Sequence, residues 1–226
     1  MYRLAIVIAA VLGVATVAIL LMLKKPNQSK GGPVYQGPGE TNLDLESPDN
    51  TLFLNLKDGR VVIQLRPDLA PLHVARIKEL VRQGFYDGLV FHRVIDGFMA
   101  QTGDPMGTGA GGSGVNLGAE FSEEKFVRGV VGMARSQDDN SADSQFYIML
   151  GDGHWLDNKY TIWGVVKDGM EFVDNIKKGG KQTNGTIDGL PDKIVSMQIA
   201  SDVADGQDKS SDEPQKSSNE PQAPAQ

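Results

Sequence analysis

The chain of 226 residues contains no cysteine, only three histidines, and more acidic than basic residues. Without cysteine it has no disulfide framework, no thiolate nucleophile and no cysteine-based metal site, and the redox compartment stays open. His73, His92 and His154 lack the spacing of metal ligands, so we expect packed or surface residues and no metal. The net charge of -7 argues against a nucleic-acid partner, because proteins that bind phosphate backbones gather Lys and Arg on one face.

Two sequence motifs, one for phosphate binding and one for serine hydrolysis, are incomplete. Residues 107–112 (GTGAGG) satisfy G-x-G-x-x-G on paper, but SGVNLG follows them instead of the helical pattern that a phosphate site needs. Ser113 in GGSGV lacks the final glycine of G-x-S-x-G, so a serine hydrolase is not indicated. We interpret these glycines as turn residues.

An uncharged apolar run, LAIVIAAVLGVATVAILLML, occupies residues 4–23. Its length suits a helix that crosses a hydrocarbon core of about 30 Å, so we expect an uncleaved membrane anchor within residues 1–23. A cleaved signal peptide is the alternative. The run is longer than the usual apolar region of about 7 to 15 residues in such peptides, and no small-x-small site separates it from Lys24 and Lys25.

Composition divides the rest of the chain into three parts. Residues 24–50 are rich in Pro, Gly and polar side chains and are expected to form a flexible spacer. Residues 201–226 lack aromatic side chains and carry more acids than lysines, so we expect a disordered acidic tail. The folded domain is therefore expected over residues 51–200.

Within this domain, short alternating runs predict a mainly β fold. TLFLNLKDGRVVIQL forms two such runs around Asp-Gly at 58–59, a strong hairpin signal. Pro71 and Gly84 bracket an aliphatic stripe that predicts one helix, and residues 170–177 predict a second. Further strands are expected at LVFHRV, FMAQT, VVGMAR, QFYIML, YTIWGVV and KIVSMQIA. Many short strands with two helices favour a closed antiparallel barrel capped at its ends over a parallel α/β sheet.

One segment, residues 91–104 (FHRVIDGFMAQTGD), combines this alternation with one arginine and one glutamine. On paired strands Arg93 and Gln101 would share a face beside Phe98 and Met99. The pieces FHRV, GFM, QTGD, MAR, SQFYI and WLD follow one another in the order of the cyclophilin family. Residues 52–199, about two thirds of the chain, thus resemble a bacterial-type cyclophilin.

The resemblance implies an eight-stranded antiparallel barrel with a helix at each end and peptidyl-prolyl cis-trans isomerase activity without a cofactor. It implies Arg93 and Gln101 as the catalytic residues. The residues that it places against the substrate are Phe98, Met99, Met133, Ala134, Arg135, Gln145, Phe146, Trp155, Leu156 and Tyr160. Arg135 stands where animal members have Asn and Tyr160 where they have His, which bears on substrate preference and inhibitor affinity more than on activity.

The residue types agree with this chemistry. Rotation about a prolyl amide breaks no bond, but resonance opposes it with a barrier of about 20 kcal/mol. In the twisted state the prolyl nitrogen regains its lone pair, and the Arg93 guanidinium would donate to it. Gln101 would orient Arg93 or the peptide carbonyl. The apolar pocket for the proline ring would be formed by Phe98, Met99, Phe146 and Leu156.

The expected partners are proline-containing polypeptides, whose folding the enzyme would assist, and the membrane through the N-terminal helix. We also expect a monomer and, because the groove resembles that of cyclophilins and keeps Trp155, cyclosporin binding. A binding module that holds a proline-containing partner without turnover is the rival function. Retention of Arg93 favours the enzyme, because a binder needs the pocket but not the donor.

Localisation depends on which side of the membrane carries the domain. The charges at Arg3 and at Lys24, Lys25 and Lys30 weakly favour the cytoplasm. Bacterial folding helpers with one N-terminal hydrophobic segment are commonly exported, so we expect a single-pass inner-membrane protein with a periplasmic domain. A cleaved, soluble periplasmic protein and a domain facing the cytoplasm are the alternatives.

Overall fold

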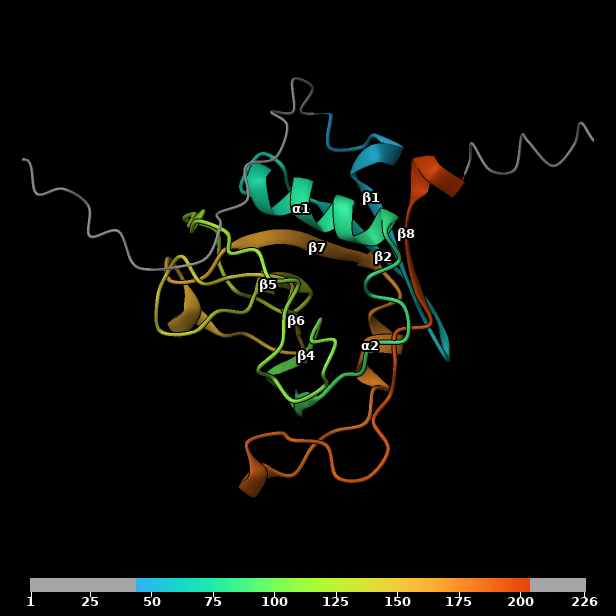
Figure 1. Cartoon of the computed structure of the whole chain (residues 1–226), viewed down its shortest axis with the longest axis vertical. Helices are drawn as coiled ribbons and strands as arrows, with labels where there is room; N and C mark the ends of the chain where they lie inside the picture. Colours follow the sequence, from blue (N-terminus) through green and yellow to red (C-terminus); the bar gives the residue numbers. More distant parts are fainter. Residues whose placement is uncertain (1–43, 204–226) are drawn as a thin grey trace, which may run out of the picture. The chain divides into compact units, whose positions relative to one another are not determined.

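The structure, a computed structural model, describes residues 44–203, which form one sheet of eight antiparallel strands with the helices α1 and α2 and a helical turn at residues 200–203 (Figure 1). The strand order in the sheet is β3-β4-β6-β5-β7-β2-β1-β8. The strands are β1 (Thr51–Leu56), β2 (Gly59–Leu65), β3 (Arg93–Ile95), β4 (Met99–Thr102), β5 (Val130–Met133), β6 (Phe146–Met149), β7 (Ile162–Asp168) and β8 (Ser196–Ile199). The helices are α1 (Pro71–Arg82) and α2 (Met170–Asp174), with 3-10 turns η1 (Pro48–Asn50), η2 (His154–Leu156) and η3 (Lys181–Thr183).

The predicted first hairpin is confirmed. Leu56 pairs with Gly59 across a two-residue turn, so the turn lies one residue earlier than the Asp-Gly signal suggests. Gly59 is the first residue of β2, and a Cβ atom there would collide with the ring of Phe172. The glycine therefore serves the packing of Phe172 against the hairpin rather than a left-handed turn.

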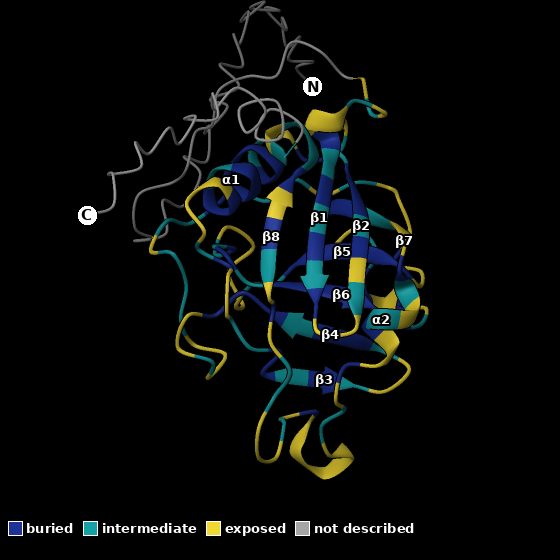
Figure 2. Cartoon of the chain, turned by 90° about the vertical axis from the view of Figure 1, so that its right-hand side faces the viewer, coloured by how far each residue is buried: buried dark blue, intermediate teal, exposed yellow. Residues whose placement is uncertain are grey.

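Both predicted helices are present, and they lie toward opposite ends of the sheet (Figure 2). Pro71 begins α1, and Gly84 follows it with φ +67°. The side chain at the N-cap makes no capping bond; instead, the Glu120 carboxylate accepts the main-chain N–H groups of Leu72 and His73 at 3.0 and 2.9 Å. Helix α2 ends at Asp174, earlier than predicted.

The barrel is only partly closed, which corrects the expectation of a closed one. Strands β3 and β8 are the two edges of the sheet, and no ladder joins them in the described part of the chain. Single bridges, Val90 to Lys193 and Arg93 to Thr186, lie where closure would be completed. The segment before β8, residues 177–191 (KKGGKQTNGTIDGLP), is rich in glycine and ends in proline, a composition that does not sustain a ladder.

Two hydrophobic clusters occupy opposite faces of the sheet at β6. Phe146 and Ile148 belong to the main core, together with Trp163, whereas Tyr147 and Met149 belong to a second cluster. This division follows from the period of two along a strand. The second cluster consists of Met99, Phe126, Val130, Tyr147, Met149, Leu156 and Ile162, and it has Phe98, Ala134 and Tyr160 packed at its margin.

Residues 44–50, the last part of the predicted spacer, contact the domain. Asn50 is buried, and its side-chain oxygen accepts a hydrogen bond from Lys78 Nζ at 3.0 Å. Across residues 44–203, none of the helices combines the length and the apolar character that a bilayer crossing requires. The predicted membrane segment at residues 4–23 lies outside the described residues, and so does the predicted tail of residues 201–226 apart from residues 201–203, which are helical rather than disordered.

Candidate active site

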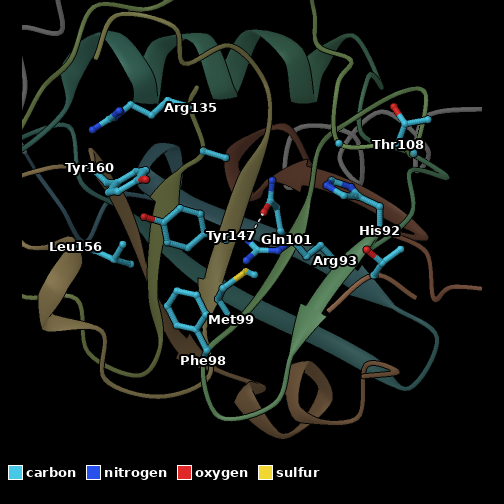
Figure 3. A pocket seen from close by; sticks show the side chains of 14 residues that line it. His92, Arg93, Phe98, Met99, Gln101, Thr108, Arg135, Tyr147, Leu156 and Tyr160 are labelled. Atoms are coloured by element: carbon cyan, nitrogen blue, oxygen red, sulfur yellow. Dashed lines mark hydrogen bonds between the residues drawn. The ribbon is translucent and has the colours of Figure 1, made fainter. Parts of the chain in front are cut away.

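A cavity of about 420 Å³ opens beside the β3–β4 hairpin, with polar side chains on one side and apolar ones on the other (Figure 3). Strand β3 supplies Arg93, and β4 supplies Met99 and Gln101. The structure brings together these predicted site residues in the lining: Arg93, Phe98, Met99, Gln101, Ala134, Arg135, Leu156 and Tyr160. Segments far apart in the sequence therefore converge on one hollow.

Arg93 lies directly opposite Gln101 in the β3–β4 register, so the two side chains share a face, as the alternation predicts. Its Nη1 donates to Gln101 Oε1 at 3.2 Å, the hydrogen bond drawn in Figure 3. On its other edge, Nε donates to the main-chain oxygen of Asn184 at 3.0 Å, and Nη2 donates to Asn184 Oδ1 at 3.1 Å. The guanidinium is thus held from two sides by neutral acceptors.

The Gln101 amide is held in turn by a second glutamine. Gln101 Nε2 donates to Gln145 Oε1 at 2.9 Å, and Gln145 Nε2 donates to the main-chain oxygens of Gly109 and Gly111 at 3.0 and 2.8 Å. All three links run in one direction, so the orientation of each amide is fixed by its neighbours. Gln145 lines an adjoining cavity of about 360 Å³, which shares Gln101 and Gly109 with the first.

Asp104 holds the glycine-rich loop that accepts the hydrogen bonds of Gln145. Its carboxylate accepts main-chain N–H groups from Met106, Thr108 and Gly109 at 2.7, 2.9 and 2.6 Å. Burial alone would raise the pKa of Asp104, but these N–H donors, with that of Gly111, outweigh it and hold the pKa at about 2. The loop glycines thus serve a hydrogen-bonded turn, as the sequence suggested.

Burial shapes the electrostatics around Arg93. Partial desolvation lowers the pKa of Arg93, and the nearby Tyr160 hydroxyl opposes that shift, yet an arginine stays protonated in either case. Burial also lowers the pKa of His92, whose two ring nitrogens have no hydrogen-bond partner in the described part of the chain. The site therefore combines a permanent cation at Arg93 with an imidazole that favours its neutral form.

The apolar side of the cavity is formed by Phe98, Met99, Tyr147 and Leu156; the last three belong to the second hydrophobic cluster, and Phe98 packs against it. Trp155 packs against Phe98 with ring centroids 5.2 Å apart and ring planes tilted by 42°, but it is 59% exposed and is not part of the lining. Trp155 therefore lies at the rim of the cavity and not in its wall.

Arg135 lines both cavities, and Tyr160 lines the first. The Arg135 guanidinium lies over the Tyr160 ring, 4.6 Å from its centroid, and donates to the main-chain oxygen of Lys159. It also pairs with Asp139 at 3.0 Å. Because Tyr160 meets Tyr147 edge to face at 6.1 Å, Arg135 fixes the aromatic side of the cavity rather than presenting a free charge.

Two predicted substrate-binding residues, Met133 and Phe146, lie elsewhere. They pair with each other across β5 and β6 and point into the main core, where both are essentially inaccessible. The next residue, Tyr147, points the opposite way and lines the cavity. A shift of one residue on a strand changes the face, which explains the difference.

Sequence reasoning also missed lining residues that come from loops: His92, Thr108 and Thr186. Only Tyr147 had a local signal, since an aromatic pair on a strand must place one ring on each face. The loop residues reach the cavity through long-range contacts that no short window contains.

Comparisons with known proteins agree with this geometry. The family described as cyclophilin type peptidyl-prolyl cis-trans isomerase/CLD matches residues 51–199. A probable peptidyl-prolyl cis-trans isomerase of Brucella suis is 55% identical over 167 residues, which cover 69% of this chain and 85% of that protein.

Solved structures give the same result. The crystal structure of cyclophilin AquaCyp293 from Hirschia baltica matches with a TM-score of 0.61 and 30% identity, covering 69% of this chain and 76% of that one. A cyclophilin-type isomerase of Cryptosporidium parvum, crystallised in the presence of the dipeptide Ala-Pro, matches with a TM-score of 0.60 and 30% identity, covering 66% and 98%. The chain belongs to the cyclophilin-type peptidyl-prolyl cis-trans isomerase family.

Proposed function

We propose that the chain accelerates rotation about X-Pro bonds in unfolded or flexible polypeptides, with Arg93 donating to the prolyl nitrogen. One observation carries this proposal. The Arg93 guanidinium lies in the wall of a cavity whose other side is apolar, and its three contacts leave part of its donor capacity unused. The same cavity thus offers an apolar surface that can bind a proline ring, with a cation beside it.

The donor count of Arg93 is the first step. A guanidinium has five N–H groups. Nε and one hydrogen each of Nη1 and Nη2 are used by Gln101 and Asn184, so one hydrogen on each terminal nitrogen has no partner among residues 44–203. These two hydrogens are the donors that a bound peptide would meet.

The second step is the difference between the planar and the twisted amide. In the planar state the nitrogen lone pair is delocalised into the carbonyl, so the nitrogen is a poor acceptor. In the twisted state the lone pair returns, and a fixed donor binds that state more strongly, which lowers the barrier. No bond is made or broken, so this mechanism needs no metal or cofactor.

The apolar wall supplies the third step. Met99 and Tyr147 belong to the second cluster, Phe98 packs against it, and the three side chains would enclose the proline ring. A ring seated there displaces water from the neighbourhood of Arg93, which strengthens the hydrogen bond to the prolyl nitrogen. The Cryptosporidium relative crystallised with Ala-Pro supports a ligand of this class.

Further aspects of the proposal rest on the sequence. We propose a bacterial-type, monomeric isomerase that assists folding at the periplasmic face of the inner membrane, tethered by residues 4–23. The uncharged apolar run supports the tether. Resistance of the full chain to carbonate extraction, and protection of the domain from protease in intact cells but not in spheroplasts, would support this topology. The groove beside Trp155 supports cyclosporin binding, which an inhibitor titration tests.

Exchange NMR on a short Xaa-Pro peptide tests the function directly. An isomerase at a small molar fraction adds cis-trans exchange cross-peaks, and its effect grows with enzyme concentration at fixed peptide. A binding module would shift peptide resonances without adding exchange. Binding without exchange would therefore reject the proposed catalysis and favour the rival interpretation.

A further inference from the structure

The segment between α2 and β8 carries one residue, Asn184, to the outer edge of the Arg93 guanidinium. Asn184 follows η3 and has φ +53°, in the left-handed region. Its main-chain oxygen accepts from Arg93 Nε at 3.0 Å, and its Oδ1 accepts from Nη2 at 3.1 Å. One residue thus engages the whole Nε–Nη2 edge.

We propose that Asn184 is a positioning residue for Arg93, one that fixes the guanidinium plane so that its unused hydrogens face the prolyl nitrogen. This inference rests on the proposed role of Arg93. Gln101 holds Nη1 from the other side, at 3.2 Å. With only Gln101 in place, the guanidinium can still turn about its long side chain, and the second attachment removes that freedom.

The segment that bears Asn184 is itself fixed to β3. Val94 N–H donates to the main-chain oxygen of Gly185 at 2.8 Å, and Gly179 N–H donates to that of Val94 at 2.9 Å. Gly185 is buried with φ +81°, and a Cβ atom there would collide with Ile95. This close approach places Asn184 at a set distance from the strand that carries Arg93.

The residue type matters for two reasons. Asparagine tolerates the left-handed region better than most residues. Its amide also offers a neutral acceptor, whereas elsewhere a carboxylate takes the same guanidinium edge, as Asp68 does for Arg66. A neutral acceptor orients the Arg93 cation without cancelling its charge, and the twisted amide would interact with that charge.

The experiment compares full-length variants by exchange NMR at saturating and subsaturating peptide. Asn184→Gly keeps the backbone conformation and the main-chain acceptor but removes Oδ1. Asn184→Asp keeps both acceptors and adds a charge. Asn158→Gly is the matched control, because Asn158 is exposed and is the other non-glycine residue with positive φ (+57°) in the described chain.

We expect Asn184→Gly to lower kcat by about 5-fold to 20-fold with KM unchanged, and Asn184→Asp to lower kcat as well. Asn158→Gly should behave like the wild type. The Arg93 Nε–H resonance should be sharp in the wild type and exchange-broadened in Asn184→Gly. In an Arg93→Ala background, Asn184→Gly should have no further effect on kcat.

Three results would overturn the inference: a wild-type kcat in Asn184→Gly, an equal loss of kcat with and without Arg93, or a loss explained by a lower melting temperature than that of Asn158→Gly. These outcomes are separate from failure of the proposed function. If Arg93→Ala itself keeps the wild-type rate, the role of Arg93 fails. If Arg93→Ala is slow and Asn184→Gly is not, only the positioning role fails.

Discussion

Removal of the Arg93 side chain is the most decisive perturbation of this site. Arg93 is half-buried, and it donates hydrogen bonds to the neutral residues Gln101 and Asn184. Among residues 44–203 it forms no ion pair, so Arg93→Ala leaves no buried carboxylate without its partner. The acceptors that lose Arg93 are near solvent and can bind water, so the stability of the fold should change little.

The expected loss of activity follows from the donors that disappear. Loss of one preorganised donor to a transition state lowers the rate by about 10²-fold to 10³-fold. At about 1.36 kcal/mol per tenfold, this corresponds to about 3 to 4 kcal/mol of transition-state stabilisation. The fall should appear in kcat/KM through kcat, because the planar substrate gains little from this donor. Arg93→Lys should recover only part of the rate, since an ammonium keeps the charge but lacks the planar set of donors.

A protease-free exchange NMR assay on an Xaa-Pro peptide measures this effect, with melting curves on the same samples. Arg60→Ala is the control. Arg60 is also a strand arginine held by a neutral amide, Asn55, but it contacts the Phe53 ring on the hairpin and lies outside the cavity. If Arg93→Ala isomerised the peptide as fast as the wild type and Arg60→Ala, the donor mechanism would be wrong.

Three other expectations follow from the same contacts. Tyr147→Ala should raise KM by about tenfold, because it removes about 1.4 kcal/mol of contact with the bound peptide. Phe146→Leu should lower the melting temperature and leave KM unchanged. Asp104 has its pKa depressed from 3.8 to about 2, so at neutral pH it should contribute about 2 kcal/mol of stability that is lost as the pH falls from about 4 toward 2. Urea unfolding of Asp104→Asn should show that loss at pH 7 and a flatter acid dependence. Burial lowers the pKa of His92, so the unfolded chain takes up its proton first and stability should fall below about pH 6.5. His92→Asn should make the melting temperature less steep between pH 7 and pH 5, and an unchanged slope would contradict this account.

Local patterns were sufficient where the site depends on a period of two. The alternation in residues 91–104 places Arg93 and Gln101 on one face, and the structure confirms that they are direct partners in the β3–β4 register. Helix α1 was equally predictable, because Pro71 and Gly84 mark its ends by their backbone preferences. Each of these signals lies within a few residues of the feature that it predicts.

The face of an aromatic pair could not be predicted in the same way. Phe146 and Tyr147 are both buried, so burial preference does not tell which one faces the core. The answer depends on the partner strand: Phe146 lies opposite Met133, and both enter the main core. Closure of the sheet was overestimated for a related reason, because the glycine-rich segment at 177–191 binds β3 through single contacts rather than through a ladder.

Because the hydrogen-bond acceptors of Arg93 are neutral, the site differs in its electrostatics from one in which a carboxylate holds the arginine. Arg66 shares its guanidinium edge with the Asp68 carboxylate, and this pairing raises the pKa of Arg66. The pKa of Arg93 moves the other way, since burial is not offset by any carboxylate. In the proposed mechanism, a partly desolvated cation without an ion-pair partner interacts most strongly with a negative potential inside the cavity, and the lone pair of a twisted prolyl nitrogen would supply that potential. On this proposal, Gln101 and Asn184 would orient the Arg93 guanidinium and leave its charge available to the substrate.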